Sequence, residues 1–142
     1  MKISIVLPAK NEAGAIGNTI EQILKLNLEA EIIVVNDGST DNTPIIAEKA
    51  GARVITHPYS KGNGAAITTG ARNASGAIII FMDADGQHDP NDILRLIEKI
   101  EEGYDLVVGA RQKGSQASVG RGIANKLYNN LATYMSDHLV ED

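Results

Sequence analysis

The 142-residue chain contains no cysteine, which excludes a disulfide scaffold and any metal or redox site built on thiolates. It has no tryptophan, one phenylalanine and four tyrosines, too few aromatic rings for a platform that stacks bases. Basic residues number 13 against 18 acidic ones, so the basic surface of a general nucleic-acid binder is missing. We therefore expect no nucleic acid among its partners.

Long apolar runs are also missing. The longest, at residues 77–82, falls far short of the roughly 20 residues that span a bilayer. The amino terminus lacks the apolar core and cleavage site of a signal peptide. Together with the absence of cysteine, this favours the cytoplasm, and the length favours a single domain.

Charge is unevenly distributed along the chain. Residues 1–108 carry 9 basic and 15 acidic side chains, whereas residues 109–136 carry four basic ones and no acid. Such a basic stretch is most often a solvated helix face and less often a surface that receives phosphate.

Short runs rich in Ile and Val alternate with segments of helical periodicity. Near-continuous apolar runs are typical of parallel strands that are buried on both faces. The sequence therefore predicts an α/β fold with a mainly parallel central sheet and helices on both faces. The expected strands lie at residues 3–7, 32–35, 53–56, 77–82 and 106–108, and the expected helices at 16–24, 43–50, 62–74 and 93–100.

Polar clusters follow four of the five expected strands. In parallel sheets, ligands bind outside the carboxyl ends of the strands. The clusters at residues 8–12, 36–41, 83–88 and 109–111 are therefore expected to meet at one edge of the sheet.

The cluster after the strand at 77–82 predicts a metal site. In extended backbone, Asp83 and Asp85 would point the same way, and two such carboxylates repel unless a cation lies between them. Mg²⁺ and Mn²⁺ prefer oxygen ligands and are held by one or two carboxylates plus substrate phosphates. The alternative is a turn in which the Asp side chains bind their own backbone. With Gln87 and the other clusters nearby, we favour the metal.

The remaining clusters each allow a functional and a purely local interpretation. Asp37 could accept hydrogen bonds from a nucleobase, and as a strand-end residue it is expected to be exposed. Arg111 could hold a phosphate or form a surface ion pair. Lys61 precedes a helix and could offer charge to an anion, although a flexible loop is equally compatible. The three residues that follow the Asn-Asp-Gly turn are expected to serve only as turn and helix caps: Ser39, Thr40 and Asp41.

Taken together and in order, the motifs resemble those of the family 2 glycosyltransferases with the A-type fold. The resemblance is strongest to the branch that includes dolichyl-phosphate mannosyltransferases, which transfer sugars to polyprenyl phosphates. The matching segments are LPAKNE at 7–12, VNDGSTD at 35–41, KGNG at 61–64, DADGQ at 83–87 and GAR at 109–111.

The resemblance implies a nucleotide-diphospho-sugar transferase architecture, which is Rossmann-like. It also implies inverting transfer of a sugar from GDP-mannose or a UDP-hexose to an acceptor, chiefly a polyprenyl or dolichyl phosphate at the cytoplasmic face of a membrane. The cofactor would be Mg²⁺ or Mn²⁺.

By the same resemblance, particular residues acquire roles. The expected nucleotide contacts are Pro8, Ala9, Glu12, Asp37, Lys61, Asp83 and Arg111. The expected metal site comprises Asp83, Asp85 and Gln87, and the acceptor phosphate would meet Arg121 and Asn125. The expected catalytic residues are Asp85, Arg111 and Asp142, with Arg111 neutralising the leaving diphosphate.

Members of this branch run well beyond 142 residues. We therefore expect one domain over 1–142 that is truncated on the acceptor side, with the donor and metal half at 1–111 and the start of the acceptor half at 112–142. The alternatives are a non-catalytic nucleotide–metal binding fragment and a family 2 transferase with a saccharide acceptor. A nucleotidylyltransferase or a haloacid dehalogenase phosphatase fits less well, because each places its signature directly after the first strand.

Overall fold

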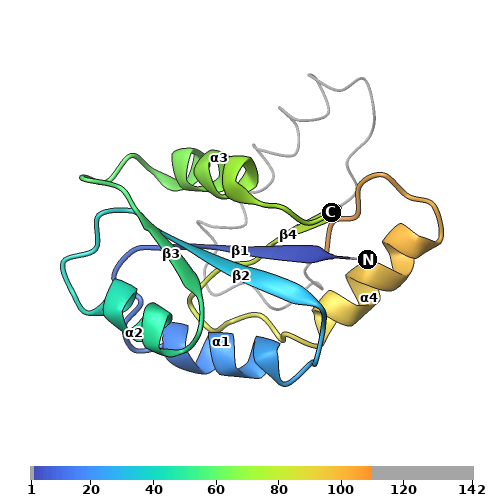
Figure 1. Ribbon diagram of the computed structural model, residues 1–142, viewed down its shortest axis with the longest axis horizontal. Coiled ribbons are helices and arrows are strands. Elements are labelled where there is room, and N and C mark those ends of the chain that lie inside the picture. Colours follow the sequence, from blue (N-terminus) through green and yellow to red (C-terminus); the bar gives the residue numbers. More distant parts are fainter. Residues whose placement is uncertain (1, 110–142) are drawn as a thin grey trace, which may run out of the picture. The chain divides into compact units, whose positions relative to one another are not determined.

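The computed structural model describes residues 2–109 of the chain (Figure 1). The chain divides into two compact units, residues 1–98 and residues 99–142. The first unit contains the entire sheet, and the described part of the second comprises the end of the last helix and an irregular segment up to residue 109.

Four strands and four helices alternate along the described residues, which confirms the predicted α/β class. The elements are β1 (Ile3–Ala9), α1 (Ile16–Leu24), β2 (Ala30–Asn36), α2 (Thr43–Lys49), β3 (Arg53–Thr56), α3 (Asn63–Asn73), β4 (Ile78–Phe81) and α4 (Asp92–Glu101). The sheet has the order β3-β2-β1-β4, and each neighbouring pair is parallel.

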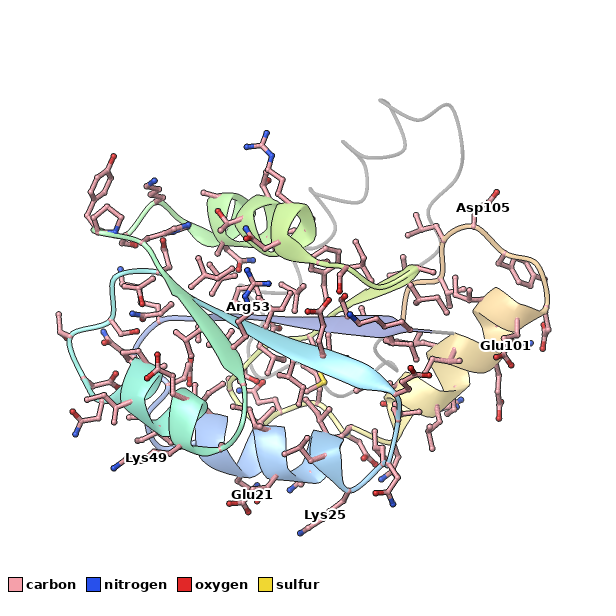
Figure 2. All side chains as sticks on the ribbon, viewed as in Figure 1. Glu21, Lys25, Lys49, Arg53, Glu101 and Asp105 are labelled. Atoms are coloured by element: carbon pink, nitrogen blue, oxygen red, sulfur yellow. The ribbon has the colours of Figure 1, made fainter. Side chains whose placement is uncertain are left out.

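Helices cover both faces of the sheet, as predicted, with α3 on one face and α1 and α2 on the other (Figure 1). Under α3 lies a buried cluster of Val6, Ile33, Val35 and Ala66. Helix α3 approaches β1 so closely that a Cβ at Gly70 would clash with Val6. Polar residues such as Glu21 and Lys49 extend from α1 and α2 away from the sheet (Figure 2).

Strand β1 is an interior strand of the sheet, and later strands are added on both of its sides. The chain first builds β2 and β3 on one side of β1 and then adds β4 on the other side. The connections therefore diverge at the carboxyl end of β1, which is where parallel sheets of this kind form their ligand crevice.

The strand predicted at residues 106–108 is wrong. This segment has no regular structure, and the side chains of Leu106 and Val108 are 80% and 78% exposed. A run of three apolar residues becomes a strand only by pairing, and in the described residues it pairs with none of the four strands. Within that same part of the chain, no helix has the length and apolar character needed to cross a membrane.

Candidate functional site

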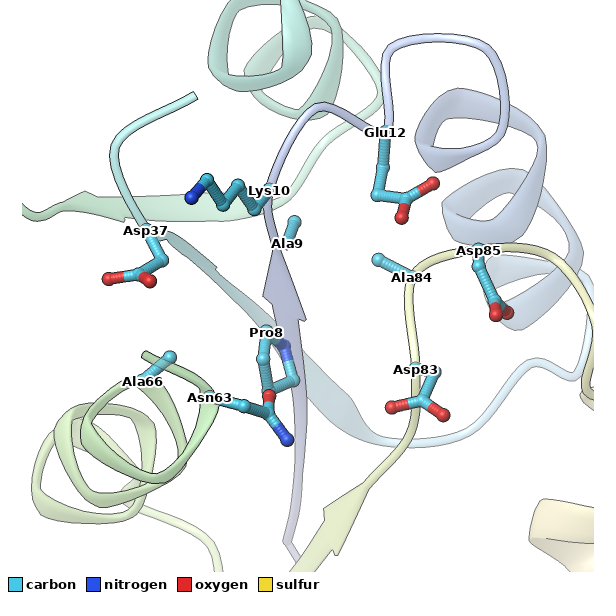
Figure 3. A pocket seen from close by; sticks show the side chains of 10 residues that line it. All are labelled: Pro8, Ala9, Lys10, Glu12, Asp37, Asn63, Ala66, Asp83, Ala84 and Asp85. Atoms are coloured by element: carbon cyan, nitrogen blue, oxygen red, sulfur yellow. The ribbon is translucent and has the colours of Figure 1, made fainter. Parts of the chain in front are cut away.

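A cavity of about 300 Å³ lies at the carboxyl end of β1. It is bounded by the residues that follow β1, β2 and β4 and by the first turn of α3 (Figure 3). The divergence of the connections at β1 thus produces the predicted crevice. The lining residues are Pro8, Ala9, Lys10, Glu12, Asp37, Asn63, Ala66, Asp83, Ala84 and Asp85.

The loop that carries Glu12 is tied to the loop after β2 by side chain–backbone hydrogen bonds. The backbone N–H of Glu12 donates to Thr43 Oγ1 at 2.8 Å, and that of Ala13 donates to Asp41 Oδ2 at 3.2 Å. The N–H of Asn11 donates to Ser39 Oγ at 2.9 Å. Asp41 Oδ1 also accepts from the N–H of Thr43 at 2.9 Å, as in an Asx turn at the start of α2. The expectation that Ser39 and Asp41 serve only as local caps is therefore wrong, because they also position the β1 loop.

Three carboxylates face the cavity on what we call its acidic side, defined by Glu12, Asp83 and Asp85 (Figure 3). The pKa of Glu12 is raised, first by desolvation and then by the charges of Asp85, Asp41 and Asp83. No hydrogen bond reaches the Glu12 carboxylate from the described residues. This side of the cavity therefore concentrates negative charge with little compensation.

A divalent cation fits this side when it is shared with a ligand. Among the described residues, no three His, Asp or Glu side chains are close enough together to hold a metal ion by themselves. Mg²⁺ is bound in many proteins by one or two carboxylates with substrate phosphates completing its shell. Asp83 and Asp85 provide such a pair, so the donor set fits Mg²⁺ or Mn²⁺ held together with a diphosphate.

The backbone around this pair differs from the extended path predicted for it. Strand β4 ends at Phe81 and a turn begins at Ala84, so Asp83 and Asp85 do not continue a strand. Asp85 Oδ1 accepts the N–H of Gln87 at 2.9 Å, which is the turn interaction that the sequence left as the alternative. Both carboxylates nevertheless reach the same cavity.

The opposite side of the cavity, which we call the anchored side, is built around Asp37. Asp37 Oδ1 accepts from His57 Nδ1 at 2.7 Å and from the N–H of Lys61 at 2.8 Å. Its Oδ2 accepts from Ser60 Oγ at 2.8 Å and from the N–H of Gly62 at 2.9 Å. Burial alone would raise the pKa of Asp37, but these four donors hold it well below its usual range.

The expectation that the Asp37 side chain is exposed is therefore wrong. The residue is 5% exposed, because the segment after β3 folds over it. Gly38 permits this close approach: its φ is +69°, and a Cβ there would lie 2.6 Å from the Ser60 nitrogen.

The sequence analysis predicted no role in the site for His57 or for its partner Thr69. His57 is 6% exposed, and its Nε2 lies 2.9 Å from Thr69 Oγ1 on α3, so it joins Asp37 to that helix. The signal was available in the sequence. His57 and Ser60 follow β3, at the same edge of the parallel sheet as the polar clusters after β1, β2 and β4.

The structure brings together six of the predicted site residues at one cavity: Pro8, Ala9, Glu12, Asp37, Asp83 and Asp85. Two others do not line it. The Lys61 ammonium lies over the Tyr59 ring, 5.6 Å from its centroid, and Gln87 is exposed in its turn. The remaining predicted residues lie outside the described residues: Arg111, Arg121, Asn125 and Asp142.

Comparison with known proteins decides the family. The family described as Glycosyl transferase family 2 matches the chain over residues 4–139. The chain belongs to glycosyl transferase family 2. The resemblance drawn from the five ordered motifs is thereby confirmed at the level of the family.

Relatives of this family 2 chain include lipid-phosphate transferases. The chain is 37% identical over 153 residues to the undecaprenyl-phosphate 4-deoxy-4-formamido-L-arabinose transferase of Proteus mirabilis, covering 99% of this chain and 46% of that protein. The chain thus spans about half the length of this curated relative.

Solved structures of similar proteins confirm the fold of the family 2 chain. Glucosyl-3-phosphoglycerate synthase from Mycobacterium tuberculosis, in complex with Mn²⁺, UDP and glucosyl-3-phosphoglycerate, is 33% identical with a TM-score of 0.72. The match covers 92% of this chain and 51% of that one. Mannosyl-3-phosphoglycerate synthase from Rubrobacter xylanophilus is 25% identical with a TM-score of 0.76, over 91% and 47% of the two chains.

Proposed function

We propose that the cavity binds the nucleoside diphosphate of a sugar donor, GDP-mannose or a UDP-hexose, together with Mg²⁺ or Mn²⁺. The observation that carries this proposal is the charge contrast within one cavity at the carboxyl end of β1. Its acidic side has carboxylates with few partners, whereas the carboxylate on its anchored side is fully hydrogen-bonded. A dianionic diphosphate needs a cation to approach such an acidic side.

Asp83 and Asp85 would hold the metal on the acidic side, and Gln87 joins them only if its turn rearranges. When bound, the cation would neutralise the charge that develops on the diphosphate as the sugar–oxygen bond breaks. The Mn²⁺ and UDP present in the Mycobacterium tuberculosis synthase support this assignment.

The remaining donor contacts follow from the lining of the cavity. Pro8 and Ala9 form its floor at the end of β1 and would pack against the nucleoside, while Glu12 borders the metal side. Lys10 Nζ donates to Ser60 Oγ at 3.0 Å and adds a positive charge beside the cavity. By the family resemblance, Lys61 would meet the nucleotide and Arg111 would neutralise the leaving diphosphate.

For the acceptor, we propose a polyprenyl phosphate at the cytoplasmic face of a membrane, held by Arg121 and Asn125, with a catalytic role for Asp142 by the family resemblance. In an inverting transfer, an acceptor phosphate oxygen forms its bond to the anomeric carbon as the bond to the diphosphate breaks. The undecaprenyl-phosphate transferase among the relatives supports this acceptor class. Residues 1–111 would form the donor and metal half and residues 112–142 the start of the acceptor half.

Isothermal titration of the chain with UDP and with GDP tests donor binding. We expect binding in the presence of Mn²⁺ or Mg²⁺ and at least tenfold weaker binding after addition of EDTA. Equal affinity with and without EDTA would remove the metal from the proposal. If neither nucleotide binds under any condition, the proposed function is wrong.

Transfer of label from GDP-mannose or UDP-glucose distinguishes the acceptors. Polyprenyl phosphate in detergent, a saccharide and 3-phosphoglycerate are supplied in parallel. We expect slow transfer to polyprenyl phosphate, because the chain spans about half the length of the undecaprenyl-phosphate transferase it matches and the positioning of donor and acceptor together can contribute roughly 7–11 kcal/mol. Donor binding without transfer to any acceptor would favour the alternative of a non-catalytic binding fragment.

A further inference from the structure

We propose that Asn63 is a self-modification site, at which the backbone nitrogen of Gly64 attacks the side-chain amide and converts it, with loss of ammonia, into a carboxylate. Asn63 lines the cavity beside four carboxylates, so its conversion would add a fifth negative charge to the same surface (Figure 3). The modification itself requires no ligand. Only its consequence for nucleotide binding rests on the proposed function.

The reaction balances with water as its only co-reactant. The backbone nitrogen of the following residue loses its proton to solvent and bonds to the side-chain carbonyl carbon, closing a five-membered succinimide ring. The bond to the amide nitrogen breaks, and its electron pair leaves with ammonia, which takes a proton from solvent. Water then opens the ring at either carbonyl and yields aspartate or isoaspartate. A glycine in the following position favours closure, because without a Cβ its backbone reaches conformations that other residues rarely adopt.

Three pairs in the chain consist of Asp or Asn followed by Gly, and the first residue of each pair lines the cavity. The pairs are Asp37-Gly38, Asn63-Gly64 and Asp85-Gly86. The Asp37 carboxylate is held by four hydrogen bonds and is 5% exposed, and Asp85 Oδ1 accepts the N–H of Gln87 at 2.9 Å. A carboxylate is also a poorer electrophile than an amide. The structure therefore leaves Asn63 as the reactive member of the three.

Both reacting groups at this pair are free. Asn63 is exposed, and its amide forms no hydrogen bond with any of the described residues. Because α3 begins at Asn63, the first N–H groups of the helix have no acceptor within it, and that of Gly64 has no partner in the described part of the chain. Beyond the neighbouring backbone, no atom lies within 4 Å of the place that a Cβ of Gly64 would occupy. The ring therefore has room to form.

Ring closure requires the backbone at Asn63 to leave its helical conformation, and little holds it there. One helical hydrogen bond closes over this residue, from the N–H of Ala66 to the carbonyl of Gly62 at 3.1 Å. Helix ends fray, so this bond opens readily. The N–H groups of Lys61 and Gly62 stay bound to the Asp37 carboxylate, so the segment before Asn63 keeps its place while the first turn opens.

Asn73, at the other end of α3, is the internal control. Its Nδ2 donates to the carbonyl of Thr69 at 2.9 Å, and its Oδ1 accepts from Arg53 at 3.3 Å. The residue that follows it is Ala74 rather than a glycine. Its amide is therefore held by the protein and lacks the favourable neighbour, although it belongs to the same helix.

The test incubates the unaltered chain without ligand at neutral and mildly alkaline pH and follows the peptides of Asn63 and Asn73 by mass spectrometry. We expect the Asn63 amide to convert at least about tenfold faster than that of Asn73, which must first break two hydrogen bonds. The products should include isoaspartate, the signature of the succinimide. The rate should rise with pH, because the attacking nitrogen must lose its proton.

Gly64→Ala tests the neighbour without altering the amide. Space for the Cβ is available, and Ala favours the helical conformation over the one that closes the ring. We expect the conversion of Asn63 to slow about tenfold in this variant, with an unchanged or higher melting temperature.

The consequence for the cavity is measured with Asn63→Asp, which reproduces the aspartate product, and with Asn63→Gln, which keeps the charge unchanged. In the proposed function the cavity receives a diphosphate, so the added charge should raise the Kd of UDP with Mn²⁺ about 3- to 10-fold relative to Asn63→Gln. The difference should shrink as salt is added, because salt screens charges near the surface.

Two results would overturn the assignment of Asn63. In one, its amide persists as long as that of Asn73; in the other, it converts equally fast in Gly64→Ala. Equal affinity of Asn63→Asp and Asn63→Gln for UDP would contradict the consequence for the cavity. Failure of the unaltered chain to bind UDP would contradict the proposed function, whereas the mass-spectrometric result would stand without it.

Discussion

The anchored and acidic sides of the cavity use the same chemical group in opposite ways. On the anchored side, one buried carboxylate accepts four hydrogen bonds and its pKa is lowered. On the acidic side, three carboxylates share the cavity with few donors, and the pKa of Glu12 is raised. The first side is stabilised by its own protein contacts, whereas the second is left with charge that a bound cation can neutralise.

This contrast distinguishes a residue that maintains the fold of the site from residues whose carboxylates are available to a ligand. A carboxylate whose acceptors are all filled contributes to folding and is costly to replace, because its donors would be left unsatisfied. Like charges held near one another without donors cost stability, and such a cost persists in proteins where binding requires it. Substitutions on the two sides should therefore alter different measured quantities.

The largest expected effect is that of Asp37→Asn on stability. The amide keeps one acceptor oxygen but places an NH₂ group against two of the four donors, at least one of which is a backbone N–H. Leaving one or two buried donors unsatisfied should lower the free energy of unfolding by about 2–4 kcal/mol. Urea denaturation followed by circular dichroism measures this change.

The matched control is Asp83→Asn, the same substitution on the acidic side. Asp83 is exposed, and its carboxylate contacts only His88 Nε2, at 3.2 Å, among the described residues. Its free energy of unfolding should stay within about 0.5 kcal/mol of that of the unaltered chain. If the two substitutions destabilise the chain equally, the contrast between the two sides is wrong.

Features of the two sides that depend on residues close together in the sequence could be predicted from it, whereas features that depend on contacts between distant residues could not. The parallel strands and the polar clusters at their carboxyl ends could be predicted, because apolar runs and the polar residues that follow them are local patterns. Thus Glu12, Asp83 and Asp85 were correctly expected at one edge. The burial of Asp37 could not be predicted, because it depends on the segment 57–62 folding back over it from β3, twenty residues further along the chain.

The turn at Asp85 and the missing strand at 106–108 illustrate the same limit. Whether Asp85 continues a strand or enters a turn depends on where β4 stops pairing with β1, at Phe81. An apolar triplet such as 106–108 has strand composition, but pairing with a neighbour decides its structure. Composition and local spacing specify neither.

The second expected effect lies on the acidic side and concerns binding. Asp85→Asn should weaken UDP or GDP binding about tenfold in the presence of Mn²⁺ and should make the remaining affinity insensitive to EDTA. In the proposed metal site, this substitution would remove one carboxylate ligand from a cation that has few others in the protein. Isothermal titration at matched Mn²⁺ concentrations measures the change, with the distant Asp92→Asn as the control. An EDTA effect as large as in the unaltered chain would show that Asp85 does not hold the metal.

The third expected effect is the pH dependence of stability contributed by Asp37. The pKa of Asp37 is lowered in the folded chain. Its ionised carboxylate therefore contributes fully to the free energy of unfolding above the pKa that Asp has in the unfolded chain, about 4, and this contribution is lost as the pH falls toward the lower pKa of the folded state. Between pH 5 and pH 3, the difference in unfolding free energy between the unaltered chain and Asp37→Asn should shrink by about 1 kcal/mol. Urea denaturation at each pH measures it.

Glu31 provides a comparison for this measurement away from the cavity. Its pKa is lowered to about 2 by hydrogen bonds from the Ser4 and Ser75 hydroxyls and the Ser75 backbone N–H. The difference in unfolding free energy between the unaltered chain and Glu31→Gln should therefore also shrink as the pH falls toward 3. If the difference in unfolding free energy between the unaltered chain and Asp37→Asn stays constant from pH 5 to pH 3, this would contradict the lowered pKa of Asp37.

The smallest expected effect, opposite in sign to the first, is that of Glu12→Gln. Desolvation and the charges of Asp85, Asp41 and Asp83 raise the pKa of Glu12, so folding disfavours its ionised form above that pKa. Without metal at pH 7, the neutral amide should raise the free energy of unfolding by less than about 1 kcal/mol, the scale of partly exposed charge interactions. This gain in unfolding free energy should vanish below about pH 4, where Glu12 is protonated in both the folded and the unfolded state. Mn²⁺ with UDP should stabilise the variant less than the unaltered chain. Thermal melting with and without Mn²⁺ and UDP measures both differences. A variant that is less stable than the unaltered chain at pH 7 without metal would show that Glu12 maintains the fold, as Asp37 does, and that the two sides of the cavity do not differ in the way described.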